Sequence, residues 1–492
     1  MSPRLERVVP AVLVTALVVA VAGLVAQLRS VGEASAGPRR ATERSTTPTR
    51  PSSARPSRSA TTLGPTTTSE PSPSPSPSED DPVLAARAAE LCAFEPVVDP
   101  EPLASDQTSV RAQIEALAGR VEELRALRFR RDVAPVFQDG DRMAAQLARR
   151  ILRSYDRATA DRDERILEAL GAIPRGTNLR RVVADGLGGD VLGYYVPKTG
   201  RLLVQKDADD GLGAGEKFVL AHELEHALAD QRLGIPQDRS VEPAEADAEA
   251  ARQALTEGDA TITMLQFATT SLSDEERLSL ATDPTLEGES SLEDAPYFVR
   301  KTFEFPYDRG ADFVCALYDR GGWDAVDRAY GDPPSSSAQV LFPQHYLDRV
   351  ESVDPRNPRP PAGGWIRQPV QSVGAADLLW LFEAPGGDRI KTLDDAERRV
   401  RGWRGGEVHL FTRGSKSAIG MDLIASGRSG LLCDSVDAWY RVSFPVERIF
   451  KKRGPERFAL ASRRQAAVLR CRAGEVRLGI GPTIPAARAV AR

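Results

Sequence analysis

Cysteine and histidine are both scarce in this chain, which has four residues of each among 492. The cysteines are far apart in the sequence, and no CxxC pair suggests a metal site built from thiolates. In an oxidising compartment, the simplest of the three possible pairings joins Cys433 to Cys471 and Cys92 to Cys315. Strongly basic character is also missing, since the net charge is −5 and no basic stretch is interleaved with aromatic residues. We therefore expect no nucleic-acid partner.

Two of the four histidines lie four residues apart in Glu216–Gly234, whose sequence is EKFVLAHELEHALADQRLG. The apolar residues of this segment recur with helical spacing, and Gly234 favours the end of a helix there. On a helix, His222 and His226 lie one turn apart on the same face, so both imidazoles can reach one metal ion. The alternative is that both are ordinary polar residues of an amphipathic helix.

This spacing predicts a zinc site with an open position for water. Glu223 follows the first histidine and would lie beside that water. It is therefore the expected general base, which takes a proton from the water. The predicted cofactor is Zn²⁺, held by His222, His226 and a carboxylate from elsewhere in the chain.

The remaining carboxylate ligand is expected from a second helix, predicted over Ser240–Thr270. Glu257 is favoured because Gly258 follows it inside the helical run, where glycine costs about 1 kcal/mol relative to alanine. A small residue at that position would let this helix approach the first one closely. Glu245 and Glu249 remain rival ligands.

The motif also carries a resemblance. HELEHALADQ is similar to the HELTHALQDQ-like segment of a poorly characterised, membrane-linked group of gluzincin-type zinc metallopeptidases. Thr256–Ala260, TEGDA, resembles the EG-x-A segment that supplies the third zinc ligand in several gluzincin groups. Glu257 follows His226 by 31 residues, which is longer than the family spacing, whereas Glu245 follows it by 19. The resemblance implies a zincin-like catalytic core and the hydrolysis of peptide bonds.

Two later segments, Phe305–Tyr330 and Pro333–Tyr346, are similar to segments that follow the zinc motif in the same group. The second departs from the group where Glu, His, Glu and Lys are expected, at Ala338, Phe342, Gln344 and His345. If the missing histidine serves catalysis, the activity is in doubt.

Peptide hydrolysis also needs a donor that stabilises the negative charge on the carbonyl oxygen. Tyr346 and His345 are the first candidates because they fall in the motif-like segment after the zinc residues. Tyr194 and Tyr195 come next. For each one, the alternative is a buried aromatic residue with a local hydrogen bond.

The fold class that we predict is α+β, with a mainly helical core and a small sheet beside the HExxH helix. Residues 82–171 are expected to be helical, with the apolar stripe of Val110–Phe129 packed inwards. A hairpin is predicted from Val191–Val196 and Arg201–Gln205, either as the edge that pairs with an extended substrate or only as support for the helix. Residues 365–492 are expected to form a smaller region of mixed helices and strands.

The first residues predict a membrane anchor and a stalk. Val8–Leu28 is uncharged, almost wholly apolar and long enough to cross a bilayer once, which favours an uncleaved signal anchor after a cytoplasmic tail, 1–7. Cleavage near Ala34–Ala36 is the alternative. Residues 29–82 are rich in Ser, Thr and Pro, so we expect a disordered stalk that holds a metallopeptidase domain, 83–350, outside the cytoplasm.

The function predicted from the sequence is that of a single-pass membrane protein with an extracytoplasmic zinc-dependent peptidase that acts on peptide or protein substrates. The alternative is a catalytically inactive zincin-like scaffold or binding protein of the cell envelope. A metal-dependent hydrolase of a non-peptide bond is a third hypothesis, because the same ligands permit it.

Overall fold

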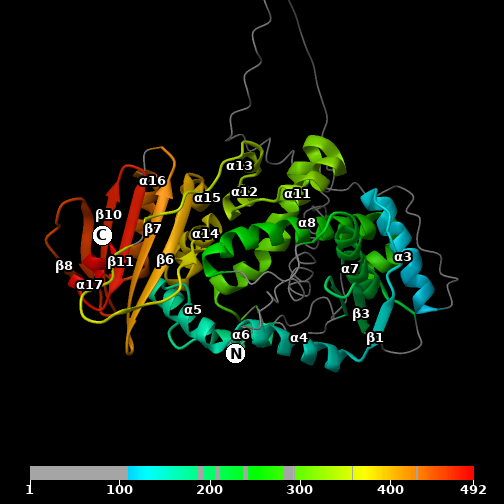
Figure 1. Cartoon of the computed structure of the whole chain (residues 1–492), viewed down its shortest axis with the longest axis horizontal. Coiled ribbons are helices and arrows are strands. Elements are labelled where there is room, and N and C mark those ends of the chain that lie inside the picture. Colours follow the sequence, from blue (N-terminus) through cyan, green and yellow to red (C-terminus); the bar gives the residue numbers. More distant parts are fainter. Residues whose placement is uncertain are drawn as a thin grey trace, which may run out of the picture.

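The computed structural model describes most of the chain after the predicted stalk, namely residues 109–186, 192–205, 211–235, 242–280, 292, 294–356, 358–427 and 430–492. The predicted anchor and stalk lie outside these ranges. Among the described residues, no helix combines the length and the apolar character that a membrane crossing requires. The fold is α+β with a mainly helical body, as predicted, and the C-terminal region of mixed helices and strands contains an antiparallel sheet (Figure 1).

Four helices open the described chain, at Val110–Arg125 (α3), Gly140–Ser154 (α4), Arg157–Leu170 (α5) and Leu179–Gly186 (α6). Side chains of Ser109, Asp139 and Asp156 accept hydrogen bonds from the first turns of α3, α4 and α5, which satisfies N–H groups that have no partner within the helix. The predicted stripe of α3 is buried at Ile114 and Leu117.

A short strand, Pro135–Gln138 (β1), interrupts this region, so the prediction of helix throughout 82–171 is wrong there. The strand pairs in parallel with Arg201–Gln205 (β3), which is antiparallel to Gly193–Val196 (β2). A segment of four residues gives too short a pattern to predict a strand from the sequence. Its extended conformation depends on pairing with β3, which lies far along the chain. The β2–β3 hairpin itself is confirmed, and β2 forms one edge of the three-stranded sheet.

The helix with the HExxH sequence, Ala214–Arg232 (α7), lies in the interior (Figure 1). Every residue from Phe218 to Ala229 is buried, so α7 is not an amphipathic surface helix. Gly234 follows its end with a φ of 85°, the left-handed conformation that favours glycine after a helix.

The predicted second helix is present as a short 3₁₀ turn, Pro243–Glu245 (η2), followed by Ala246–Ser271 (α8). It packs against α7 on one side and on the other against Tyr297–Gly331 (α11), which is kinked at Gly321 and Gly322. The other helices that the structure describes in this body are Asp274–Leu280 (α9), Ser337–Leu341 (α12) and Pro343–Leu347 (α13).

Gly258 does not have the role predicted for it. A Cβ at Gly258 would lie 2.2 Å from the carbonyl oxygen of Gly310 in α11, and a Cβ at Gly310 would lie 2.2 Å from that of Ala254. The two glycines thus bring the backbones of α8 and α11 into contact, whereas the prediction was an approach of α8 to the HExxH helix. The glycine was correctly read as a close-packing residue, but its partner helix is a different one.

Three helix N-termini meet at two acidic side chains, Asp247 in α8 and Asp377 in Ala375–Glu383 (α14). Both carboxylate oxygens of Asp247 accept hydrogen bonds from the backbone N–H of Ser337, at the start of α12, at 3.2 Å. Ser337 Oγ accepts a bond from Ala376, and Asp377 accepts one from Gly374. This joint attaches the first turn of α8 to the C-terminal region.

The C-terminal sheet is antiparallel and has the strand order β4-β6-β7-β11-β10-β9-β8, with β5 also paired to β6. Its strands are Ile366–Arg367 (β4), Gln371–Ser372 (β5), Trp403–Arg413 (β6), Lys416–Ala425 (β7), Arg448–Ile449 (β8), Glu456–Ala461 (β9), Ala466–Arg472 (β10) and Glu475–Gly481 (β11). One face of the sheet shares a large apolar core with α14 and Gly430–Ser443 (α16). Ile484–Val490 (α17) packs on the other face, and Ala396–Val400 (α15) precedes the first long strand.

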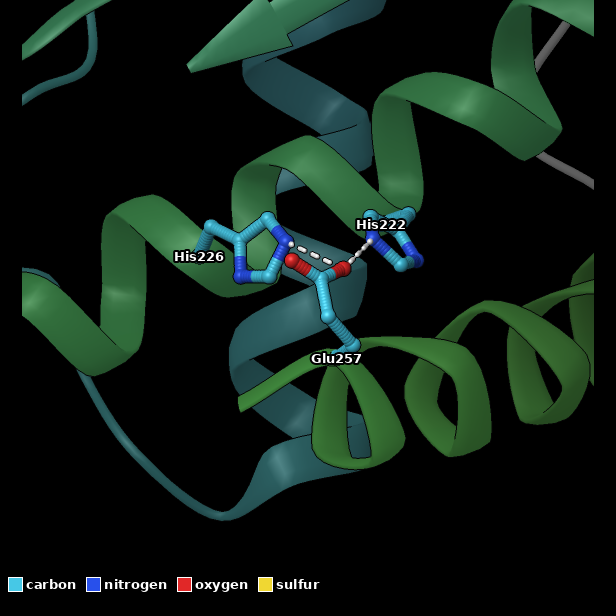
Figure 2. Close-up of side chains that lie close together, drawn as sticks. All are labelled: His222, His226 and Glu257. Carbon is cyan, nitrogen blue, oxygen red and sulfur yellow. Dashed lines mark hydrogen bonds and ion pairs between the residues drawn. The ribbon is translucent and has the colours of Figure 1, made fainter. Parts of the chain in front are cut away.

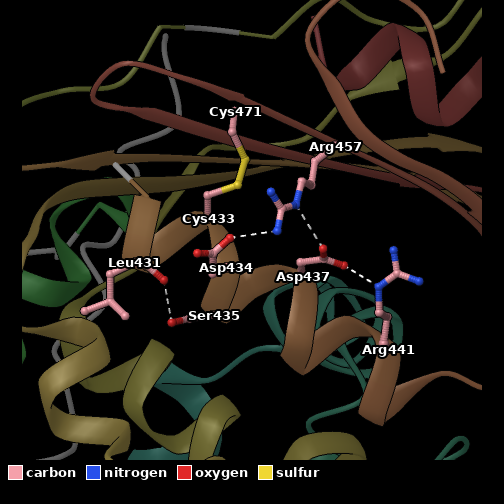
Figure 3. Close-up of a disulfide and its surroundings, with 8 residues drawn as sticks. All are labelled: Leu431, Cys433, Asp434, Ser435, Asp437, Arg441, Arg457 and Cys471. Atoms are coloured by element: carbon pink, nitrogen blue, oxygen red, sulfur yellow. Dashed lines mark hydrogen bonds and ion pairs between the residues drawn. A yellow bond between two sulfur atoms is a disulfide. The ribbon is translucent and has the colours of Figure 1, made fainter. Parts of the chain in front are cut away.

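A disulfide joins α16 to strand β10 through Cys433 and Cys471, as predicted (Figure 3). Nearby, Arg457 lies between Asp434 and Asp437 and forms an ion pair with each of them. The other predicted pairing involves Cys92, which lies outside the described residues.

Candidate metal centre

The two central helices bring His222, His226 and Glu257 together, with one possible ligand atom from each residue within 4.8 Å of the others (Figure 2). Glu257 Oε2 lies 3.2 Å from His222 Nε2 and 3.3 Å from His226 Nε2. The three residues are at most 4% exposed. The predicted helical spacing is therefore confirmed, and Glu257 is the carboxylate that meets the histidines.

The two rival carboxylates lie in other surroundings. Glu245 is exposed at the end of η2, before α8 begins. Glu249 lies in the first turns of α8, where it accepts hydrogen bonds from Arg252 at 2.7 and 2.9 Å. Neither residue belongs to the group that could hold a metal ion.

The pKa values of the three residues depend on one another and on burial. Burial lowers the pKa of His222 to about 4. Burial also opposes ionisation of Glu257, but the two histidines outweigh it and bring its pKa down to about 2. Burial lowers the pKa of His226, but Glu257 and the other neighbouring carboxylates outweigh it and raise the value to about 10. Glu257 is thus held as a carboxylate, the form that binds a metal.

The chemistry of the three donors fits a zinc ion. Two imidazole nitrogens and one carboxylate oxygen are the protein ligands of one class of catalytic zinc site, in which a further position stays open. His226 Nε2 and Glu257 Oε1 are buried and have no hydrogen-bond partner among the described residues. Such atoms are costly to bury unless something binds them, and a cation at the centre of the group would do so.

Glu223, the predicted general base, is 4% exposed and lies against the small sheet. Its Oε2 accepts a hydrogen bond from the backbone N–H of Tyr195, in edge strand β2, at 2.6 Å. Burial raises the pKa of Glu223 to about 8, although His226 and this hydrogen bond act in the opposite direction. The hairpin and the HExxH helix are therefore joined at the residue expected to carry the proton.

The other predicted site residues lie on two further elements. In α13, the Tyr346 hydroxyl donates to the carbonyl oxygen of Asp332 at 2.8 Å, and the tyrosine ring packs against Phe313. The His345 ring lies 5.4 Å from that of Phe342. A role for either residue in stabilising a carbonyl oxygen stays a prediction.

The two tyrosines of β2 differ in their surroundings. The Tyr195 hydroxyl donates to Asp230 Oδ2 at 2.7 Å. Tyr194 is 5% exposed, and burial raises the pKa of its hydroxyl, to which the charge of Glu223 also contributes. Of the two, Tyr194 is the one whose hydroxyl pKa is affected by the charge of Glu223.

Sequence reasoning missed several residues of the site. Tyr307 in α11 stacks on His222, with ring centroids 6.1 Å apart and an interplanar angle of 23°. It lies in the FPYDRG segment, which carried the resemblance, but nothing in that segment singled out the tyrosine. Glu225 and Asp259 were quoted within their motifs without a role, and both are completely buried beside Arg125.

The site is therefore a buried His-His-Glu group of the HExxH-plus-Glu type that could hold a metal ion. This geometry is consistent with the gluzincin-like motif. It is the structural observation that supports the resemblance. No known family model matches the chain, and no curated protein or solved structure is significantly similar to it.

Proposed function

We propose that this protein is a zinc-dependent peptidase. The observation that carries the proposal is the convergence of His222, His226 and Glu257, whose buried donor atoms lie within 4.8 Å of one another. The sequence similarity to gluzincin motifs supports the choice of peptide bonds as substrate. The departures around Phe342–His345 support the alternative of an inactive scaffold.

In the proposed reaction, His222, His226 and Glu257 hold the zinc ion. The zinc, when bound, supplies a Lewis acid and lowers the pKa of water so that a nucleophile forms near neutral pH. Glu223 takes the proton and returns it to the amine of the departing peptide. General base catalysis is favoured when the pKa of the base is shifted towards the working pH, and burial raises the pKa of Glu223 in that direction.

The small sheet is the proposed place for the substrate backbone. Strand β2 is an edge strand, so one side of it has no neighbouring strand within the described sheet. An extended peptide can add to such an edge through backbone hydrogen bonds. The bond between Tyr195 and Glu223 places this edge next to the proposed base.

The proposed location is the outer side of a membrane. Its support is the apolar segment Val8–Leu28 and the Ser/Thr/Pro-rich residues that follow it. A single anchor and a long polar spacer would hold the peptidase near the membrane surface.

The full chain, purified in detergent, provides the test. Glu223→Gln should keep its zinc and lose hydrolysis of a peptide library, whereas His222→Ala should lose both. Zinc content is measured by atomic emission, and hydrolysis is measured with and without a chelator. Full activity of Glu223→Gln overturns the assigned role, and a wild-type chain that binds zinc but cleaves no peptide favours the scaffold.

A further inference from the structure

A group of buried charged residues lies directly behind the proposed zinc site. Arg125 at the end of α3, Glu225 in α7 and Asp259 in α8 are each 0% exposed. Arg125 binds Asp259 through two hydrogen bonds, Nε to Oδ1 at 2.8 Å and Nη2 to Oδ2 at 3.0 Å. The Tyr330 hydroxyl donates to the same carboxylate at 2.9 Å, and the guanidinium lies 4.2 Å from the centre of the Trp323 ring. The position of the arginine is thus fixed from several sides.

Glu225 lies between this arginine and the metal ligand that follows it in the sequence. Its Oε1 is 4.0 Å from Arg125 Nε, and its Oε2 is 3.8 Å from His226 Nδ1. The other ring nitrogen of His226, Nε2, faces Glu257. His226 therefore has the proposed metal position on one side of its ring and a carboxyl group on the other.

The two carboxyl oxygens of Glu225 and the Nδ1 atom of His226 have no hydrogen-bond partner within the part of the chain that the structure describes. Burial of a carboxyl group without hydrogen bonds lowers the stability of a protein. Stability alone therefore does not explain an acidic residue at this position. Histidines that bind a metal commonly donate their second N–H to a carboxylate, which fixes the tautomer and the orientation of the ring.

We propose that Glu225 is a positioning residue for His226, and that the clamp between Arg125 and Asp259 holds Glu225 in place. A small closure of the 3.8 Å separation would let a carboxyl oxygen of Glu225 accept the Nδ1–H of His226. This leaves Nε2 unprotonated and directed at the metal. The inference rests on the metal site of the proposed function, but it does not depend on the substrate.

The other histidine is held differently. His222 has the ring of Tyr307 against it, and among the described residues its ion-pair partner within 4.0 Å is Glu257, on the metal side. The proposal is therefore specific to one of the two histidines.

The test compares two substitutions of Glu225 in the full chain. Glu225→Ala removes the acceptor and should weaken zinc binding about 10- to 100-fold. Glu225→Gln keeps a carbonyl oxygen at the same place and should restore most of the affinity. Zinc dissociation constants are measured by competition with a chelator, and the absorption spectrum of the Co²⁺-loaded protein reports changes in ligand geometry.

A core substitution in the same helix separates positioning from stability. Leu228→Ala removes a completely buried apolar side chain of α7, so it should destabilise the metal-free chain without changing the Co²⁺ spectrum. Glu225→Ala should change the spectrum, and its metal-free chain should lose less stability than that of Leu228→Ala, because Arg125 keeps its two hydrogen bonds to Asp259. Equal zinc affinity and spectra in wild type and Glu225→Ala overturn the inference but leave the zinc peptidase intact. A wild-type chain without zinc affinity overturns both.

Discussion

The helix pair α7 and α8 and the C-terminal sheet bury their side chains in different ways. In the helix pair, six ionisable side chains are at most 4% exposed, namely His222, Glu223, Glu225, His226, Glu257 and Asp259. In the sheet, the corresponding central positions of β6 and β7 are occupied by apolar residues such as Val408, Leu410 and Met421, each about 1% exposed. A sheet face of this kind needs only an apolar cover, which α14 and α16 provide.

The ionisable groups that the sheet does bury have partners at its rim. Asp422 and Glu456 form ion pairs with Arg477 and Arg488, whose side chains are 15% and 13% exposed. Buried polar atoms without hydrogen bonds occur in both regions of the described structure, and in the sheet they include both carboxylate oxygens of Asp422. In the helix pair, by contrast, they form a cluster on Glu225, Glu257 and the two histidines, which are linked by successive contacts of 3.2 to 3.8 Å. The difference teaches that α7 and α8 are not organised for stability alone, and that their polar groups are arranged for a ligand.

The largest effect is expected from Arg125→Met. Removal of one partner from a buried ionic group leaves the carboxylates without a countercharge, so the free energy of unfolding should fall by about 3–5 kcal/mol. Arg457→Met in the C-terminal region is the matched control, because the Arg457 side chain is 50% exposed and its ion pairs should contribute less than about 1 kcal/mol. Urea denaturation measures both. Equal losses in the two variants would contradict the contrast between the regions.

Loss of the disulfide should have the next largest effect. Cys433 and Cys471 are separated by 38 residues, and a crosslink that closes a loop of this size typically contributes about 2–4 kcal/mol. The double substitution Cys433→Ala with Cys471→Ala should lower the thermal midpoint of the C-terminal region without changing zinc affinity. A loss of zinc affinity in this variant would mean that the sheet helps to shape the metal site.

The smallest effect is expected at the joint between the two regions. Burial raises the pKa of Asp247 to about 6, and burial together with the nearby Asp247 raises that of Asp377 to about 7. The folded chain therefore holds these protons more tightly than the unfolded chain, whose carboxyl groups titrate near pH 3.8. The stability that the protons contribute is complete below about pH 4 and is lost as pH rises through 6 and 7.

Asp377→Asn should flatten this part of the pH profile. The amide keeps an oxygen for the Gly374 N–H and carries no charge, so unfolding free energies of wild type and variant should diverge on going from pH 5 to pH 8. The expected difference is on the order of 1 kcal/mol, because solvent screens a partly buried group. If the free energy of unfolding depends on pH in the same way in wild type and variant, Asp377 does not titrate over this pH range.

The parts of the site that the sequence predicted are those encoded by local spacing. His222 and His226 are four residues apart on one helix, and the adjacent Gly258 favoured Glu257 as the third ligand. The β2–β3 hairpin was equally local, because two β-type runs flank a turn that ends in Gly200. Such features depend on residues close together in the chain, and they were correct.

The parts that were missed depend on contacts between distant residues. Arg125 and Asp259 are 134 positions apart, and no local pattern marks either one as the partner of the other. Strand β1 was missed for the same reason, because its partner β3 begins at Arg201. Gly258 was recognised as a packing residue, but the sequence could not say that Gly310 would be the residue it contacts.

The contact between Gly258 and Gly310 has a consequence for how this site can change over time. The backbones of α8 and α11 are in contact at Gly258, one residue after Glu257. The position of the Glu257 backbone is therefore fixed by a contact between two main chains. Side chains, which can adopt other rotamers, do not form this contact. Substitutions that change the volume of surrounding core residues should therefore leave the position of Glu257, the third ligand, unchanged. The same contact makes these two positions intolerant of any larger residue, so drift elsewhere in the body coexists with a fixed coordination geometry.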